Sequence, residues 1–126
     1  MIHDPGARER LILELREHAL ILGEVVLTSG VTAQYYVDAK RAILRPPGFL
    51  ALAELVDEQA AAWGATAVGG MTMGADPVAC SALAATSRDI KAFFVRKQAK
   101  GHGLQRRLEG PTLDPSDRCM VVEDVV

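Results

Sequence analysis

The residues of this sequence best suited to chemistry are concentrated in one segment, residues 96–107, with the sequence RKQAKGHGLQRR. It holds five of the fourteen Lys and Arg residues, one His and no acid, although the chain as a whole has a net charge of −2. Lys is a point charge, Arg a two-pronged donor and His a proton donor near neutral pH. Such a cluster on an acidic protein indicates a site for one compact anion. The glycines at 101 and 103 predict a loop that closes over a polyphosphate.

Two other interpretations of this segment remain open. A basic loop that is simply solvated is the plainest explanation of any such run. A nucleic-acid-binding segment would carry interleaved aromatic side chains or helical periodicity, and neither is present. The mixture of three cation types beside glycines favours the anion-binding loop.

A second segment, GGMTMGADP at residues 69–77, joins an expected strand to an expected helix. Glycines let backbone N–H groups approach an oxyanion, and a helix N-terminus adds partial positive charge. No Gly-Lys-Ser/Thr follows, so the segment is not a nucleotide-binding P-loop. It predicts a phosphate cradle, with a tight structural turn as the alternative.

The third segment is VVEDVV at residues 121–126, an apolar strand that leads directly into Glu123 and Asp124. Adjacent carboxylates at a strand end bind Mg²⁺ or accept hydrogen bonds from sugar hydroxyls, and an ordinary acidic loop is the alternative. A phosphate cradle, a cationic loop and an acid pair together predict a site for a phosphorylated sugar.

These segments need a scaffold that brings them together. The alternation of expected elements predicts an α/β fold with a parallel sheet and helical crossovers. In such sheets ligands bind beyond the carboxyl ends of the strands, so the three segments should meet at one edge. Periodicity predicts helices over about 5–22, 49–63 and 76–86, a hairpin of strands 24–28 and 33–38, and strands 66–68, 91–95 and 119–122.

Length and composition set the class of protein. A chain of 126 residues supports one domain, and 49% hydrophobic with 24% charged residues is typical of a globular protein. The opening MIHDPGARER lacks a signal-peptide pattern, and glycines interrupt the least charged run, residues 59–75. We therefore expect a cytoplasmic protein.

The sequence FFVRKQAKGHGLQRRLEGP at residues 93–111 strongly resembles the flexible catalytic loop of the orotate phosphoribosyltransferase family. Residues 121–126 resemble the start of that family's phosphoribosyl-pyrophosphate motif. Residues 27–38 resemble its N-terminal hairpin, and residues 69–77 its pyrophosphate-contacting loop. The resemblance extends from about residue 10 to the end of the chain.

The resemblance implies the type I phosphoribosyltransferase fold, an α/β fold whose parallel sheet is flanked by helices, with a small N-terminal hood, here incomplete at the C-terminus. Residues 1–126 would form a single domain, with the hood at about 1–45 and the core at about 46–126. The implied reaction transfers phosphoribosyl from phosphoribosyl pyrophosphate to orotate, a glycosyltransferase step of pyrimidine biosynthesis. Mg²⁺ would be held through the substrate.

The implied assembly is a homodimer in which the loop of residues 96–110 reaches the neighbouring subunit, with no nucleic-acid or membrane partner. Lys100 and His102 would be catalytic, and Glu123 and Asp124 would hold the ribose hydroxyls. The residues implied to bind phosphoribosyl pyrophosphate are Arg96, Lys97, Lys100, His102, Glu123, Asp124, Val125 and Val126.

The chain departs from the family pattern at three places. Thr28 and Met73-Gly74 stand where many members have lysine and Tyr-Lys. The sequence also stops at Val126, inside the motif, so we expect a fragment of an enzyme of about 150–200 residues. A chain that ends there is expected to be inactive and poorly stable.

Two related functions compete with the orotate enzyme. A purine or uracil phosphoribosyltransferase is disfavoured by the loop pattern. A regulatory protein that keeps the fold and binds nucleic acid usually adds an N-terminal helix-turn-helix, and one short helix precedes the hairpin here.

Overall fold

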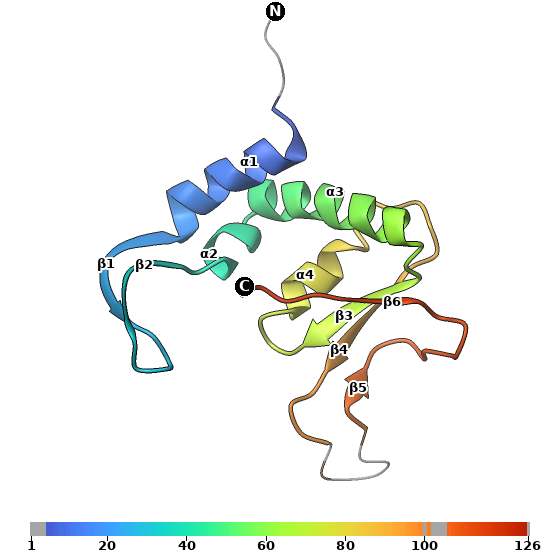
Figure 1. Cartoon of the computed structure of the whole chain (residues 1–126). Helices are drawn as coiled ribbons and strands as arrows, with labels where there is room; N and C mark the ends of the chain where they lie inside the picture. The colour runs from blue at the N-terminus through green and yellow to red at the C-terminus, as the bar shows by residue number, and fades with distance from the viewer. Residues whose placement is uncertain (1–4, 100, 102–105, 126) are drawn as a thin grey trace, which may run out of the picture.

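The structure, a computed structural model, describes residues 5–99, 101 and 106–125. Its N-terminal part consists of a helix, a hairpin and a short helix, and a helix–sheet core follows (Figure 1). The elements in chain order are α1 (Ala7–Glu14), the π-helical turn η1 (Leu15–Ala19), β1 (Leu20–Val26), β2 (Thr32–Val37), α2 (Lys40–Ile43), α3 (Pro46–Trp63), β3 (Ala67–Met71), α4 (Asp76–Ser81), β4 (Lys91–Val95), β5 (Leu108–Glu109) and β6 (Cys119–Val121).

The core sheet has the strand order β5-β4-β3-β6. Both β4 and β6 run parallel to the central strand β3, which confirms the parallel sheet predicted from the alternation of elements. The two-residue strand β5 pairs antiparallel with β4 and was not predicted. It is too short for a periodic signal, and pairing alone defines it.

The core between the sheet and the helices is built from small and branched side chains. Val68 and Met120 from the sheet pack against Val56 of α3 and Val78 of α4. Alanines fill the remaining space, with Ala60, Ala79 and Ala82 fully buried. Small side chains let the helices approach the sheet closely, as interior packing density requires.

The N-terminal part contains the predicted hairpin, but its boundaries differ from those expected. The first helix was predicted to stop at Gly23, whereas β1 already begins at Leu20. Gly23 instead lies where the pairing register shifts between Leu22 and Val25. The shift is a strand bulge, whose extra residue glycine accommodates readily.

The two core helices also differ from the prediction at one end each. Helix α3 begins at Pro46, in a stretch expected to be a break, because proline is tolerated in the first turn. It ends at Gly64 as predicted. Helix α4 stops at Ser81 rather than near residue 86, since Leu83 and Ala84 bond back three residues in a tighter turn.

The N-terminal part is joined to the core through helix contacts. Helix α1 lies along α3, and α2 packs beside it at Gly48, where a Cβ atom would lie 2.1 Å from the Ala42 carbonyl oxygen. The chain after β6 runs back towards α2 and the hairpin (Figure 1). Within the described residues no helix combines the length and apolar character needed to cross a membrane.

Candidate functional site

The three predicted segments lie at one edge of the sheet. Strand β3 is flanked by β4 and β6, and both neighbours are parallel to it, so the carboxyl ends of all three strands point the same way. Residues 72–75, 96–99 and 122–125 follow these ends. This confirms the expectation that the segments meet, although they are far apart in the sequence.

The glycines of the GGMTMGADP segment have two different structural roles. Strand β3 continues through Gly70, where a Cβ would lie 2.2 Å from the Val122 carbonyl oxygen. Gly70 therefore permits close strand packing rather than ligand approach. At Gly74, in the loop after β3, a Cβ would lie 2.2 Å from Oδ1 of Asp124.

The helix N-terminus expected to attract phosphate carries its own carboxylate. The hydroxyl of Thr72 donates a hydrogen bond to Asp76, the first residue of the six-residue helix α4. Asp76 offsets the partial positive charge of this short helix, so the helix contributes less to an anion site than predicted. The peptide between Thr72 and Met73 is cis. Among the described residues, the amides of Met73 and Gly74 donate to no backbone carbonyl, which leaves two donors at this loop.

Asp124 is the most enclosed carboxylate of the site. Its side chain is 8% exposed, and Lys40 Nζ from α2 donates to its Oδ2 at 3.2 Å. Burial by itself would raise the pKa of Asp124, but hydrogen bonds with Glu123 and Lys40 outweigh burial, and this pKa lies below its ordinary value. Asp124 is therefore held ionised beside the Gly74 loop.

Glu123, the other predicted carboxylate, lies in a different environment. It is exposed, and its Oε1 accepts a hydrogen bond of 2.8 Å from the Asp124 amide. Val125, also named from the resemblance, is 66% exposed. The acid pair thus contains one enclosed and one solvent-facing carboxylate.

The stem of the cationic loop is fixed by hydrogen bonds between its two limbs. The Arg96 amide donates to the Arg107 carbonyl at 2.7 Å. The Arg107 guanidinium donates to the carbonyls of Arg96 and Lys97 at 3.0 to 3.2 Å. Arg107 therefore joins the two limbs of the stem. Lys100, His102 and Val126 lie outside the described residues.

A pocket of about 580 Å³ opens between this stem and the end of β3. Thr72 and Phe94 line its strand side, and Lys97 lies exposed on its rim. The Arg96 guanidinium also lines the pocket, but its Nε donates to Glu109 Oε1 of β5 at 3.0 Å. Sequence reasoning missed Glu109, because the contact depends on β5 pairing beside β4.

A second pocket, of about 610 Å³, lies between the hairpin and the end of the chain. Tyr35 and Tyr36 of β2 form one wall, and Asp124 and Val125 form part of the other. The sequence predicted no site role for the tyrosine pair. Two adjacent exposed aromatics in a hairpin strand were the available signal.

The described part of the chain contains no group of three or more His, Cys, Asp or Glu side chains able to hold a metal ion. At the strand edge the carboxylates are Asp76, which is bonded to Thr72, and the pair Glu123 and Asp124, of which Lys40 already engages Asp124. Glu123 remains as a carboxylate donor on the solvent side.

Comparison with known proteins identifies relatives of this arrangement. No protein-family model matches the chain. It is 48% identical over 118 residues to the orotate phosphoribosyltransferase of Corynebacterium glutamicum (strain R), covering 94% of this chain and 64% of the relative. The chain therefore spans just under two thirds of the length of this curated relative.

Solved structures agree in fold. The orotate phosphoribosyltransferase of Mycobacterium tuberculosis H37Rv in complex with Fe(III) dicitrate superposes with a TM-score of 0.79 at 43% identity, over 95% of this chain and 67% of that one. The same enzyme in complex with 5-phospho-alpha-D-ribosyl 1-diphosphate gives 0.74 at 36% identity, over 94% and 64%. The fold is the expected type I phosphoribosyltransferase fold, and the chain belongs to the orotate phosphoribosyltransferase family.

Proposed function

We propose that the protein transfers the 5-phosphoribosyl group from phosphoribosyl pyrophosphate to orotate, giving orotidine 5′-monophosphate and pyrophosphate in pyrimidine biosynthesis. The observation that carries this proposal is the meeting of an enclosed, ionised Asp124 and the cationic loop stem at one sheet edge. Family membership supports the choice of orotate, since the relatives are named for it.

In this proposal one pocket holds the attacking base and the other holds the departing pyrophosphate. The ribose lies at Asp124, which accepts hydrogen bonds from its hydroxyls and favours positive charge on the sugar. Orotate fills the pocket lined by Tyr35 and Tyr36, where aromatic faces suit a planar base. Pyrophosphate fills the pocket beside Lys97, which Thr72 at the start of the loop after β3 also lines.

The chemical step breaks the bond between C1 of the ribose and a pyrophosphate oxygen, and an orotate nitrogen forms the new bond to C1 as its N–H proton passes to the departing pyrophosphate or to water. Negative charge grows on the departing pyrophosphate. Lys97 and Arg96 stabilise this charge from the stem, and Lys100 and His102 are proposed to stabilise it from the loop. To contact the pyrophosphate, Arg96 must first break its hydrogen bond with Glu109.

Mg²⁺, when bound, would neutralise pyrophosphate charge and orient its oxygens. Glu123 is the side chain best placed to contact the ion, directly or through water, because Asp124 is engaged by Lys40. Most ligands of the ion would come from the substrate.

We further propose a cytoplasmic homodimer in which the loop of residues 96–110 closes over the neighbouring subunit's site. The resemblance of residues 93–111 to the family's flexible catalytic loop is what supports this proposal, and the hydrogen bonds of Arg107 hold together the two limbs of the stem. The hood of about 1–45 and the core of about 46–126 would then form one active unit.

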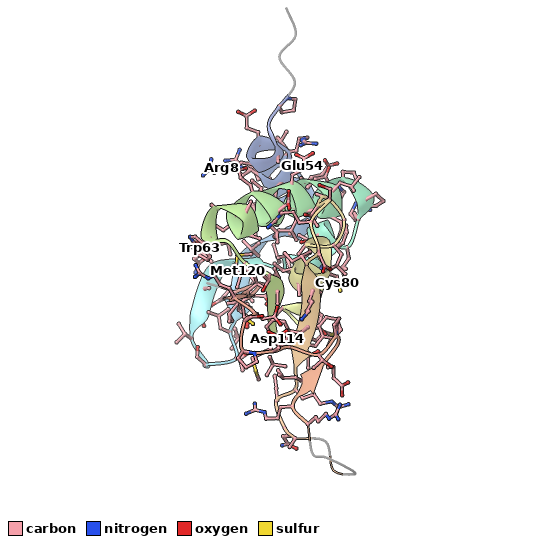
Figure 2. The ribbon with its side chains drawn as sticks, turned by 90° about the vertical axis from the view of Figure 1, so that its right-hand side faces the viewer. Arg8, Glu54, Trp63, Cys80, Asp114 and Met120 are labelled. Atoms are coloured by element: carbon pink, nitrogen blue, oxygen red, sulfur yellow. The ribbon has the colours of Figure 1, made fainter. Side chains whose placement is uncertain are left out.

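Formation of orotidine 5′-monophosphate from orotate, phosphoribosyl pyrophosphate and Mg²⁺ tests the proposal, in protein expressed from its complete coding sequence. Lys100→Ala is expected to lower kcat by more than ~100-fold, the scale of one preorganised charge contact. Arg8→Ala, an exposed cation on α1, is the matched control and should leave kcat unchanged (Figure 2).

A near-normal kcat for Lys100→Ala would contradict the assignment of the loop. Product with uracil or a purine base in place of orotate would favour the related transferases. Salt-sensitive retention on DNA, without turnover, would favour a regulatory protein.

A further inference from the structure

We propose that Lys40 is a positioning residue for the reaction: it orients the Asp124 carboxylate toward the ribose and couples that carboxylate to the N-terminal hairpin. The proposal rests on the proposed function for the identity of the ligand at Asp124. The ion pair itself does not depend on that function.

The contact joins two parts of the molecule that are distant in sequence. Lys40 is the first residue of α2, directly after the hairpin, and Asp124 follows β6. Nζ of Lys40 lies 3.2 Å from Oδ2 of Asp124, and the Lys40 side chain is 37% exposed while that of Asp124 is 8% exposed. An enclosed carboxylate needs a charged or hydrogen-bonding partner, and Lys40 supplies both.

Packing against Gly74 fixes the position of Oδ1, the other carboxylate oxygen of Asp124. Oδ1 lies so close to Gly74 that a Cβ atom there would be 2.2 Å away. One oxygen is therefore held by the N-terminal part and the other rests on the loop after β3. This arrangement leaves the carboxylate little freedom to turn away from the site.

The charged neighbours of this pair support a positioning role. Asp38 Oδ1 lies 3.7 Å from Lys40 Nζ, and Arg41 Nε lies 3.3 Å from Asp38 Oδ2. The hydrogen bond to Asp124 raises the pKa of Lys40, to which Asp38 and Tyr36 also contribute. Lys40 is therefore cationic at neutral pH.

The same pair links the two substrate positions. Tyr36 and Asp124 line one pocket, and Lys40 lies near both. A shift of the hairpin when a base enters this pocket would move Lys40, and with it the carboxylate that orients the ribose. Lys40 thus couples binding of a base in this pocket to the orientation of the ribose.

Lys40→Met tests the proposal, with Arg41→Met as the matched control because Arg41 is a neighbouring cation that pairs with Asp38 instead. The first measurement is the ¹³C chemical shift of the Asp124 carboxyl at neutral pH without substrate, assigned through Asp124→Asn, in protein expressed from its complete coding sequence. Lys40→Met should shift this resonance, because the hydrogen bond to Oδ2 is lost, and Arg41→Met should leave it unchanged. An unchanged resonance in Lys40→Met would overturn the proposal, whether or not the protein is an orotate enzyme.

The second measurement is kinetic. Lys40→Met should lower kcat/KM for phosphoribosyl pyrophosphate by about tenfold or more, the scale of one charge-assisted hydrogen bond. The loss should appear in the parameters for phosphoribosyl pyrophosphate more than in KM for orotate, and Lys40→Arg should restore most of the activity. A purely structural role would lower stability without this split and without rescue by Lys40→Arg, which would also count against positioning.

Gly74→Ala gives an independent route to the same carboxylate. The added Cβ should displace Asp124 rather than the backbone, so the fold is kept while the contact with Lys40 weakens. The combined loss in Lys40→Met with Gly74→Ala should be smaller than the product of the single losses. Fully multiplicative losses would show that the two residues act on different groups. If Lys40→Met does not fold, Lys40→Gln takes its place in each of these comparisons.

Discussion

At the scale of single residues, charged side chains at this site are restrained by other charged groups before any ligand binds. Asp124 is held by Lys40, and Arg96 is held by Glu109. In the first pair the Asp124 side chain is only 8% exposed, although Lys40 is 37% exposed, whereas Arg96 and Glu109 have side-chain exposures of 43% and 41%. The first contact therefore orients its carboxylate strongly, whereas the second is a weak restraint that a ligand can displace.

The weakness of the Arg96–Glu109 pair leads to a testable expectation. Glu109→Gln should tighten pyrophosphate binding by about two- to fivefold, because an exposed ion pair of this kind contributes at most about 1 kcal/mol. Titration calorimetry with pyrophosphate measures the change, and Glu54→Gln on the distant helix α3 is the control. Weaker binding in Glu109→Gln would show that Glu109 holds Arg96 in its binding position.

At the scale of elements, the helix boundaries depend on a few backbone positions. Helix α3 ends at Gly64, whose φ of 64° places it in the left-handed region. No atom lies within 4 Å of a Cβ built there, so a side chain would meet no steric obstacle apart from its own backbone. Glycine is thus required at position 64 only because the backbone there is left-handed.

Gly64→Ala should lower the free energy of unfolding by about 1 kcal/mol, the cost of a left-handed non-glycine residue. Gly6→Ala is the control, because Gly6 has a φ of −65° and also has no atom within 4 Å of its Cβ position. Urea denaturation compares the two. Equal stability of both variants would mean that α3 shifts its end to avoid the strained residue.

At the scale of the whole molecule, the two ends of the sheet have different roles. The carboxyl edge carries the candidate site, and the opposite edge carries a polar cluster around Asp117. Its carboxylate accepts hydrogen bonds of 2.8 Å from Lys91 and Thr66 and one of 2.9 Å from the Asp114 amide. These contacts tie the starts of β3 and β4 to the segment that leads into β6. Asp114, at this end of the molecule, is labelled in Figure 2.

Asp117 makes the stability of the fold depend on pH in the acidic range. The hydrogen bond from Lys91, followed by those from the Asp114 amide and Thr66, lowers the pKa of Asp117 from 3.8 to about 2. A folded-state pKa below the ordinary value stabilises the fold above about pH 4, and this contribution is lost as pH falls toward 2. Asp117→Asn should therefore lower Tm by several degrees at neutral pH and by progressively less below pH 4. Calorimetry across this range measures it, with exposed Glu58→Gln as control; a constant difference down to pH 2 would contradict the assignment.

Local sequence determined much of this protein. The apolar runs at 91–95 and 119–122 predicted strands, and Gly64 predicted a helix end, because these signals act within a few residues. The motif residues predicted the family and the shared sheet edge. Parallel topology follows from the alternation of elements, so meeting of the strand ends was also predictable.

Tertiary structure alone decided which side chains touch. Lys40 and Asp124 are 84 positions apart, and Arg96 meets Glu109 only because β5 pairs beside β4. Gly70, predicted to approach a phosphate, serves strand packing against Val122 instead. Contacts of this kind depend on how crossovers place distant segments to within an ångström, and residue type and spacing do not encode that distance. The sequence determined the chemistry available at the edge, and the fold determined which carboxylate is held ready for it.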